Sequence, residues 1–195
     1  MSLHDLNPKK KQLLSDGKSL IGKWCVAHLL PIPKIVTYDG KPTFATCAYY
    51  RDNTIHIWPK ACAAVGRAGQ QWSYPGYTVD RTPYGVLAHE TGHYSDKAHG
   101  TKGGTFSHIW IRETEEEAIS GYCPNSNEWY AEMFRVFLTN PDLLKILRPK
   151  TFAKFFQRWP IHIETRGWEE VLAGSPRHIR AVRNKITALG RKSQR

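Results

Sequence analysis

The N-terminal part of the chain has apolar positions at helical spacing. Between residues 9 and 30 they recur three and four positions apart, at Leu13, Leu14, Leu20, Ile21, Trp24 and Val26. This spacing predicts an amphipathic helix whose apolar stripe packs on a core. The sequence LPIP follows at residues 30–33, and because proline cannot continue a helix, we expect the helix to end there.

The next segment has the pattern of short strands. Residues 34–40 predict a strand and turn, and residues 43–59 predict two strands joined by a tight hairpin at Asp52-Asn53. Alternate positions of the second of these strands fall on two faces, Thr54, His56 and Trp58 on one and Ile55 and Ile57 on the other. Residues 60–81, rich in Gly, Gln and Tyr, are expected to be irregular.

Helical patterns dominate the rest of the chain. Thr82-Pro83 has the residue types of an N-cap and a first helical position, which predicts a helix from there that fades by Gly100. After a loop at GTKGGTF, Thr114 and Glu117 stand at capping-box spacing and predict a short helix over TEEEAISG. Further helices are expected over 125–140, from Pro141, over 149–159, and from Ser175-Pro176 to about Gly190.

Length and composition fit one folded domain with a tail. The chain has 195 residues, of which 41% are hydrophobic and 23% charged, a globular composition. The elements predict an α+β fold, with a small N-terminal sheet followed by a mostly helical part. We assign residues 1–165 to a single domain and residues 166–195 to a basic helical extension.

The net charge of +11 and the pI near 9.6 bear on partners. A charge this positive favours nucleic acid, an acidic protein or a membrane surface as the binding partner. A basic protein that has no such partner fits the charge equally well. No run approaches the roughly 20 apolar residues of a membrane span, and no signal peptide is evident, which predicts a soluble cytoplasmic protein. The four cysteines, none in a Cys-x-x-Cys pair, indicate reduced thiols and no zinc knuckle.

Residues 89–93 read His-Glu-Thr-Gly-His, which is the pattern His-Glu-x-x-His. Residues four apart share a helix face, so His89 and His93 can both reach one Zn²⁺ at about 2.0–2.1 Å. Glu90 lies about 100° around the helix from His89. There it can take a proton from a metal-activated water. Gly92 costs a helix about 1 kcal/mol relative to alanine, which suggests that another element comes close at this position.

A catalytic zinc site needs a third protein ligand, and the sequence offers two candidates. His99 would give a pattern close to that of metzincins, but Asp96 stands where that pattern has glycine, and no methionine suits the turn that metzincins place beneath the metal. Glu128 would come from a separate helix. Glu132 lies four residues further on the same face, so one carboxylate can bind the metal while the other holds a histidine by its free ring N–H.

Together, the two segments resemble the catalytic domain of anthrax lethal factor and its relatives. That family shows His-Glu-x-Gly-His-x-x-Asp followed by a Glu-aromatic-aromatic-Ala-Glu-x-Phe-Arg helix. The matching stretches here are HETGHYSD at 89–96 and EWYAEMFR at 128–135. The resemblance covers about residues 80–160. Residues 138–156 also resemble small phage-encoded metallopeptidases, which would make the protein virion-associated.

The resemblance implies a zincin-like catalytic domain over residues 1–165, with the zinc helix at 82–97 and the third-ligand helix at 126–139. The implied activity is that of a gluzincin-type zinc endopeptidase acting on a protein or peptide substrate. The implied Zn²⁺ ligands are His89, His93 and Glu128, with Glu90 as general base.

Three further residues receive roles from this resemblance. Tyr122 would stabilise the oxyanion, at a spacing one residue shorter than in the family. Glu132 and Asp96 would orient the zinc histidines, and His99 would be a loop residue. His56 and His108 could line the cleft, although lone histidines are more often structural. Residues 54–59 could form an edge strand that pairs with an extended substrate, or an ordinary strand.

The C-terminal extension suggests a different function. From residue 177 to 195 there are seven Lys or Arg residues and no acid. The candidate nucleic-acid contacts are Arg177, Arg180, Arg183 and Lys185. A solvated basic helix face is the simpler interpretation. The alternative to an enzyme is therefore a basic phage-particle or DNA-associated protein that retains a structural metal site.

Overall fold

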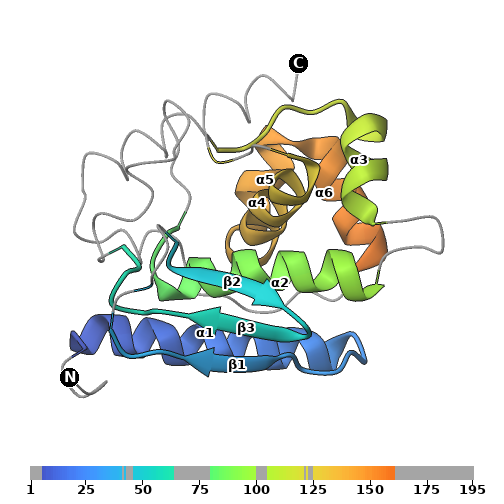
Figure 1. Cartoon of the computed structure of the whole chain (residues 1–195). Coiled ribbons are helices and arrows are strands. Elements are labelled where there is room, and N and C mark those ends of the chain that lie inside the picture. The colour runs from blue at the N-terminus through green and yellow to red at the C-terminus, as the bar shows by residue number, and fades with distance from the viewer. Residues whose placement is uncertain are drawn as a thin grey trace.

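The computed structural model describes residues 6–40, 42, 46–63, 80–99, 105–120, 122 and 125–160, and it is an α+β structure (Figure 1). A three-stranded sheet lies at one side, and helices make up most of the rest. The elements are α1 (Pro8–Ala27), β1 (Lys34–Thr37), β2 (Ala48–Arg51), β3 (Thr54–Ile57), α2 (Pro83–His99), α3 (Phe106–Thr114), α4 (Ser126–Thr139), α5 (Pro141–Leu147) and α6 (Pro149–Arg158). The predicted order of a small sheet followed by helices is confirmed.

Helix α1 forms where the apolar spacing predicts it. The Asn7 side chain caps its start by accepting from Lys9 N at 2.9 Å, and the helix ends at Ala27, shortly before the predicted boundary. Five of the six predicted core positions are buried, namely Leu13, Leu14, Leu20, Ile21 and Trp24. The prediction is wrong for Val26, which is 66% exposed. The buried face of the helix includes the neighbouring residue Cys25 instead.

The sheet has the order β1-β3-β2, with β1 parallel and β2 antiparallel to β3. Asp52 and Asn53 both have positive φ, 48° and 56°, as a tight hairpin with the right-handed twist of its strands requires. Ile55 and Ile57 lie on one face of β3, as predicted, and that face is the buried one. Of the two alternatives for residues 54–59, the structure shows the ordinary strand, because β1 pairs with one side of β3 and β2 with the other, which makes β3 the central strand. The edge strand beside α2 is β2.

Helix α2 begins at Pro83, as predicted, and a residue further upstream caps it. Asp80 Oδ1 accepts from Thr82 N at 2.8 Å, while the Thr82 carbonyl accepts from Val86 N at 2.9 Å. The helix runs to His99, which agrees with a predicted end before Gly100. Helices α4, α5 and α6 also lie where they were expected.

The predicted helix over residues 114–121 is wrong. Thr114 is the last residue of α3, which begins at Phe106 within the expected loop, and Glu115 ends it with a left-handed φ of 54°. The carboxylate of Glu116 instead accepts from the N–H groups of Lys150 at 3.0 Å and Thr151 at 2.8 Å. The acidic stretch therefore places an acid at the N-terminus of α6, a different helix from the one predicted.

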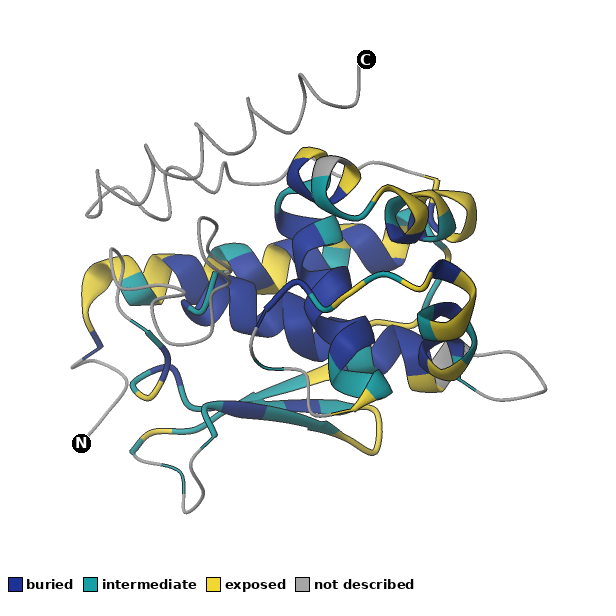
Figure 2. Ribbon diagram, turned by 90° about the horizontal axis from the view of Figure 1, so that it is seen from above, coloured by how far each residue is buried: buried dark blue, intermediate teal, exposed yellow. Residues whose placement is uncertain are grey.

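Helix α2 occupies the centre of the molecule. It contacts the sheet, α1 and α4, and the buried residues concentrate along these contacts (Figure 2). A Cβ added to Gly92 would lie 2.7 Å from Ala131 Cα and 3.1 Å from Phe134 Cβ, both on α4. The backbones of α2 and α4 therefore touch at Gly92, which is the close approach that a glycine within this helix suggests.

Among the described residues, no helix has the length and apolar character needed to cross a membrane. Most of the segment predicted to be irregular, residues 64–79, lies outside the described residues, as do the helix expected from Ser175-Pro176 and the basic extension at 166–195.

We expect Gly92→Ala to lower the free energy of unfolding by about 1–3 kcal/mol, because the added methyl group overlaps the α4 backbone. The matched control is Gly22→Ala in α1, where an added Cβ meets nothing within 4 Å. This control should raise stability by about 0.5–1 kcal/mol. Urea denaturation measures both changes. A Gly92→Ala variant as stable as the wild type would show that the helices are not in contact there.

Candidate metal centre

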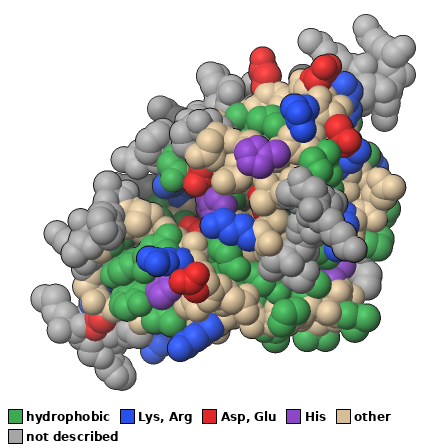
Figure 3. Space-filling model, turned by 45° about the vertical axis from the view of Figure 1, so that its right-hand side comes forward, with side chains coloured by type: hydrophobic (Ala, Val, Ile, Leu, Met, Phe, Trp, Pro, Cys, Tyr) green, Lys and Arg blue, Asp and Glu red, His purple; other side chains and the backbone are tan. Residues whose placement is uncertain are grey.

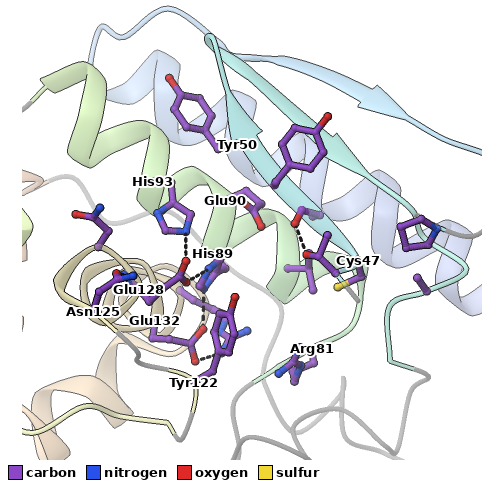
Figure 4. Close-up of a pocket in the computed structure, with 18 of the residues that line it drawn as sticks. Cys47, Tyr50, Arg81, His89, Glu90, His93, Tyr122, Asn125, Glu128 and Glu132 are labelled. Carbon is purple, nitrogen blue, oxygen red and sulfur yellow. Dashed lines mark hydrogen bonds and ion pairs between the residues drawn. The ribbon is translucent and has the colours of Figure 1, made fainter. Parts of the chain in front are cut away.

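Helices α2 and α4 bring two imidazoles and one carboxylate together (Figure 4). One ligand atom from each of His89, His93 and Glu128 lies within 4.8 Å of the other two. His89 Nε2 is 3.1 Å from Glu128 Oε2, and His93 Nε2 is 3.4 Å from Glu128 Oε1. Both ring nitrogens thus face the same carboxylate, and the three donors surround a space that one metal ion would fill.

Local sequence explains how each donor is presented. His89 and His93 are one helical turn apart on α2. Glu128 lies in the first turn of α4, where the side chain of Asn125 caps the helix by accepting from Glu128 N at 3.0 Å. Burial opposes ionisation of Glu128, but hydrogen bonds from the two histidines prevail and hold its pKa well below the usual range. The carboxylate is therefore ionised, as metal binding requires.

A buried carboxylate holds the other ring nitrogen of His89. Glu132 Oε1 lies 2.7 Å from His89 Nδ1, and Glu132 Oε2 accepts from Ser120 Oγ and from the Arg135 guanidinium. Burial opposes the charge on Glu132, yet Arg135 and His89 lower its pKa to about 2. The negative charge of Glu132 keeps the proton of His89 on Nδ1. The other ring nitrogen, Nε2, is then the one that faces Glu128.

The carboxylates act on His89 in return. Burial alone would lower its pKa, but its hydrogen bonds with Glu128 and Glu132 raise the pKa to about 9. A cation bound among the three donors would take the place of the proton on Nε2, since metals bind neutral imidazole. The same geometry that favours a proton there therefore favours a metal ion.

Glu90 and Tyr122 line the same pocket. Glu90 is 5% exposed, and burial raises the pKa of its carboxyl group. The Tyr122 ring centroid is 6.0 Å from that of His89, and the Tyr122 N–H donates to Ser120 Oγ at 3.2 Å. Burial also raises the pKa of the Tyr122 hydroxyl, so it remains a proton donor at neutral pH.

The pocket around these groups has a volume of about 660 Å³. Histidine, acidic and basic side chains lie next to one another in a hollow of the surface (Figure 3). The pocket is bordered on one side by the edge strand β2 and the residues before it, numbers 46–50, and on the other by the start of α4. The pocket is also lined by five residues that were not predicted to belong to the site, namely Cys47, Arg81, Lys97, Asn125 and Arg135.

Of these residues, only Arg135 had a usable signal. It stands three residues after Glu132 within the matched EWYAEMFR stretch, a spacing that permits an ion pair on one helix. Arg81 lies just before α2, and Cys47 reaches the pocket from a segment far away in the sequence. No local pattern marks either residue as part of the pocket.

Other candidates lie elsewhere. Asp96 Oδ1 accepts from Ser107 N at 2.9 Å, so its carboxylate serves the start of α3. His56 lies on the sheet, 2.8 Å from the Tyr38 hydroxyl, and His108 Nδ1 is 3.2 Å from Ser126 Oγ; neither is among the residues that line the pocket. The four candidate nucleic-acid contacts at 177–185 are outside the described residues.

The geometry of α2 decides between the two candidate third ligands. The helix continues through His99, and ten residues of helix rise about 15 Å. The backbone of residue 99 therefore lies well along the axis of α2 from the turn that carries His89 and His93. Glu128, by contrast, is in contact with both imidazoles.

No protein-family model matches the chain, and no curated protein or solved structure matches it.

We expect Glu128→Ala to weaken Zn²⁺ binding by more than about 100-fold, since even the loss of a residue that only orients a ligand costs about 10–100-fold. His99→Ala and Glu117→Ala, the latter an exposed glutamate outside the centre, should bind like the wild type. Isothermal titration calorimetry with Zn²⁺ measures the three affinities. Loss of binding in His99→Ala together with normal binding in Glu128→Ala would contradict the assignment.

Glu132→Gln should lower Zn²⁺ affinity by about 10–100-fold, because His89 loses the anion that holds its Nδ1 proton. Glu113→Gln is the control, since that glutamate pairs with Lys154 at the surface. Circular dichroism establishes that each variant is folded before its affinity is measured. A folded Glu132→Gln protein with wild-type affinity would show that the contact with His89 has no influence on the metal.

Proposed function

We propose that this protein is a zinc-dependent endopeptidase with a zincin-like fold. The observation that supports this most strongly is the convergence of His89, His93 and Glu128 in a pocket that Glu90 also lines. A metal held only for stability needs no carboxylate beside its ligands. Glu90 is buried next to His89, where its charge is costly, and a role in proton transfer accounts for that cost.

The donor set suits a catalytic zinc ion. Two imidazoles and one carboxylate form one of the ligand sets of zinc peptidases, and three protein ligands leave a fourth position open. A Zn²⁺ ion held there would lower the pKa of water and polarise a peptide carbonyl. The second ring nitrogen of His89 is fixed by Glu132, which is the kind of outer contact that such sites use.

Glu90 is the proposed general base. Its carboxylate lies in the pocket and accepts a proton from the attacking water. It then gives that proton to the nitrogen of the leaving amine, so the carboxylate is regenerated. Its raised pKa, caused by burial, improves its fit to both tasks near neutral pH.

Tyr122 is the proposed donor to the developing oxyanion. Its ring lies beside that of His89, and its hydroxyl stays protonated. The guanidinium carbon of Arg81 is 5.9 Å from the centre of the Tyr122 ring. A hydrogen bond from a fixed hydroxyl to the oxyanion would stabilise the transition state more than the substrate.

An extended peptide is the proposed substrate, and β2 is the strand that would pair with it. The strand order places β2 at the edge of the sheet, and residues 46–50 border the pocket. Adding a peptide as a further strand would carry one of its carbonyl groups past the metal centre. This gives β2 the role for which residues 54–59 were one candidate from the sequence.

We expect Glu90→Gln to bind Zn²⁺ like the wild type and to lose at least about 100-fold in kcat/KM, because a glutamine cannot accept the proton. Tyr122→Phe should lower kcat by about 10–1000-fold with little change in KM. A mixture of quenched fluorescent peptides provides the assay, and the chelator-treated protein serves as the blank.

Two results would overturn the proposal. The first is a Glu90→Gln variant with normal turnover, which would exclude this glutamate as the base. The second is a wild-type protein that holds Zn²⁺ and cleaves neither peptides nor unfolded proteins. That second result would favour the non-catalytic alternative, in which the ion only stabilises a basic binding protein.

A further inference from the structure

Two thiols that the proposed peptidase chemistry does not use lie against each other at the wall of the pocket. Cys47 stands immediately before β2 and lines the pocket (Figure 4). Cys62 lies in the turn after β3, is 4% exposed, and is hydrogen-bonded to Cys47. Neither cysteine is in a disulfide. Cys47 therefore lines the pocket, and Cys62 is its buried neighbour.

Backbone contacts with a single residue hold the pair in place. The Trp58 N–H donates to the Cys47 carbonyl at 2.9 Å, and Cys62 Sγ lies 3.6 Å from the Trp58 carbonyl oxygen. The Cys47 carbonyl thus bonds to the N–H of Trp58, and the Cys62 sulfur bonds to the carbonyl of the same residue. This arrangement keeps the sulfurs together without a covalent bond.

The surroundings make the two sulfurs unequal. The side-chain hydrogen bond with Cys62, aided by the positive charge of Arg81, lowers the pKa of Cys47 to about 7. That hydrogen bond and burial raise the pKa of Cys62. Burial also raises the pKa of Cys25 to about 12. Cys47 is therefore the nucleophile of the pair, and Cys62 is its protonated neighbour.

We propose that Cys47 and Cys62 form an oxidation site, which a peroxide entering the metal pocket converts to a disulfide. The Cys47 thiolate attacks one oxygen of hydrogen peroxide, so an S–O bond forms, the O–O bond breaks, and the departing oxygen leaves as water after gaining a proton. The Cys62 sulfur then attacks the Cys47 sulfur, and the hydroxyl leaves with the Cys62 proton as a second water. Two thiols and one peroxide thus give one disulfide and two waters.

The position of the pair gives this reaction a structural consequence. The disulfide would join the residue that precedes the edge strand β2 to the turn that follows β3. It would also protect Cys47 from irreversible oxidation, because a nearby thiol captures the sulfenic acid before a second peroxide does. This inference does not depend on peptidase activity, since it requires only the pocket and the two sulfurs.

The test is to treat the full chain with one equivalent of hydrogen peroxide at pH 7 and to map the peptides without reduction. We expect a linked peptide that contains Cys47 and Cys62, a mass loss of two hydrogens, and a fall in titratable thiols from four to two. Cys47 should be consumed at least about tenfold faster than Cys25, because only Cys47 has an appreciable thiolate fraction at this pH.

Three variants distinguish this site from other thiol chemistry. Cys62→Ser should stop at a sulfenic acid on Cys47 that dimedone traps, whereas Cys25→Ser should form the linked peptide as the wild type does. Cys123→Ser removes a cysteine outside the described residues and should also form it. The proposal is overturned if Cys47 reacts no faster than Cys25, or if Cys123→Ser abolishes the disulfide of Cys47.

Discussion

The contact between α2 and α4 at Gly92 is the constraint on which the metal centre depends. Because Gly92 has no side chain, its helix can lie directly on the backbone of Ala131. At that separation Glu128, which is about one turn before Ala131 on α4, reaches the imidazoles one turn apart on α2. A larger residue at position 92 would move the carboxylate away from both histidines.

A second constraint is electrostatic. Glu132 is buried at the same helix contact, and it is tolerated there because Arg135, Ser120 and His89 all bond to it. Removing an imidazole or the guanidinium would leave a charge buried without compensation, which is strongly destabilising. Folding and metal binding therefore use the same polar groups, and the orientation of His89 is set before any metal ion arrives.

The helices and the paired histidines follow from local spacing, which is why the sequence alone could predict them. The third donor could be proposed from the sequence. The choice between Glu128 and His99 required knowing that α2 continues past residue 93 to residue 99. The short helix at 114–121 was predicted wrongly, and the position of residues 54–59 within the sheet was left open, for a common reason. Both depend on partners distant in sequence: β1 beside β3, and the N-terminus of α6 beside Glu116. Cys47 enters the pocket through tertiary packing alone.

The central claim is that one metal ion is bound between α2 and α4 by two imidazoles and one carboxylate. Crystals of the protein grown with Zn²⁺, and diffraction data collected at the zinc absorption edge, test it most directly. If the ion binds there, we expect one strong anomalous peak about 2.0–2.2 Å from His89 Nε2, His93 Nε2 and an oxygen of Glu128. A peak that lacks Glu128 among its neighbours, or a fully occupied zinc site elsewhere with none at this helix contact, would contradict it.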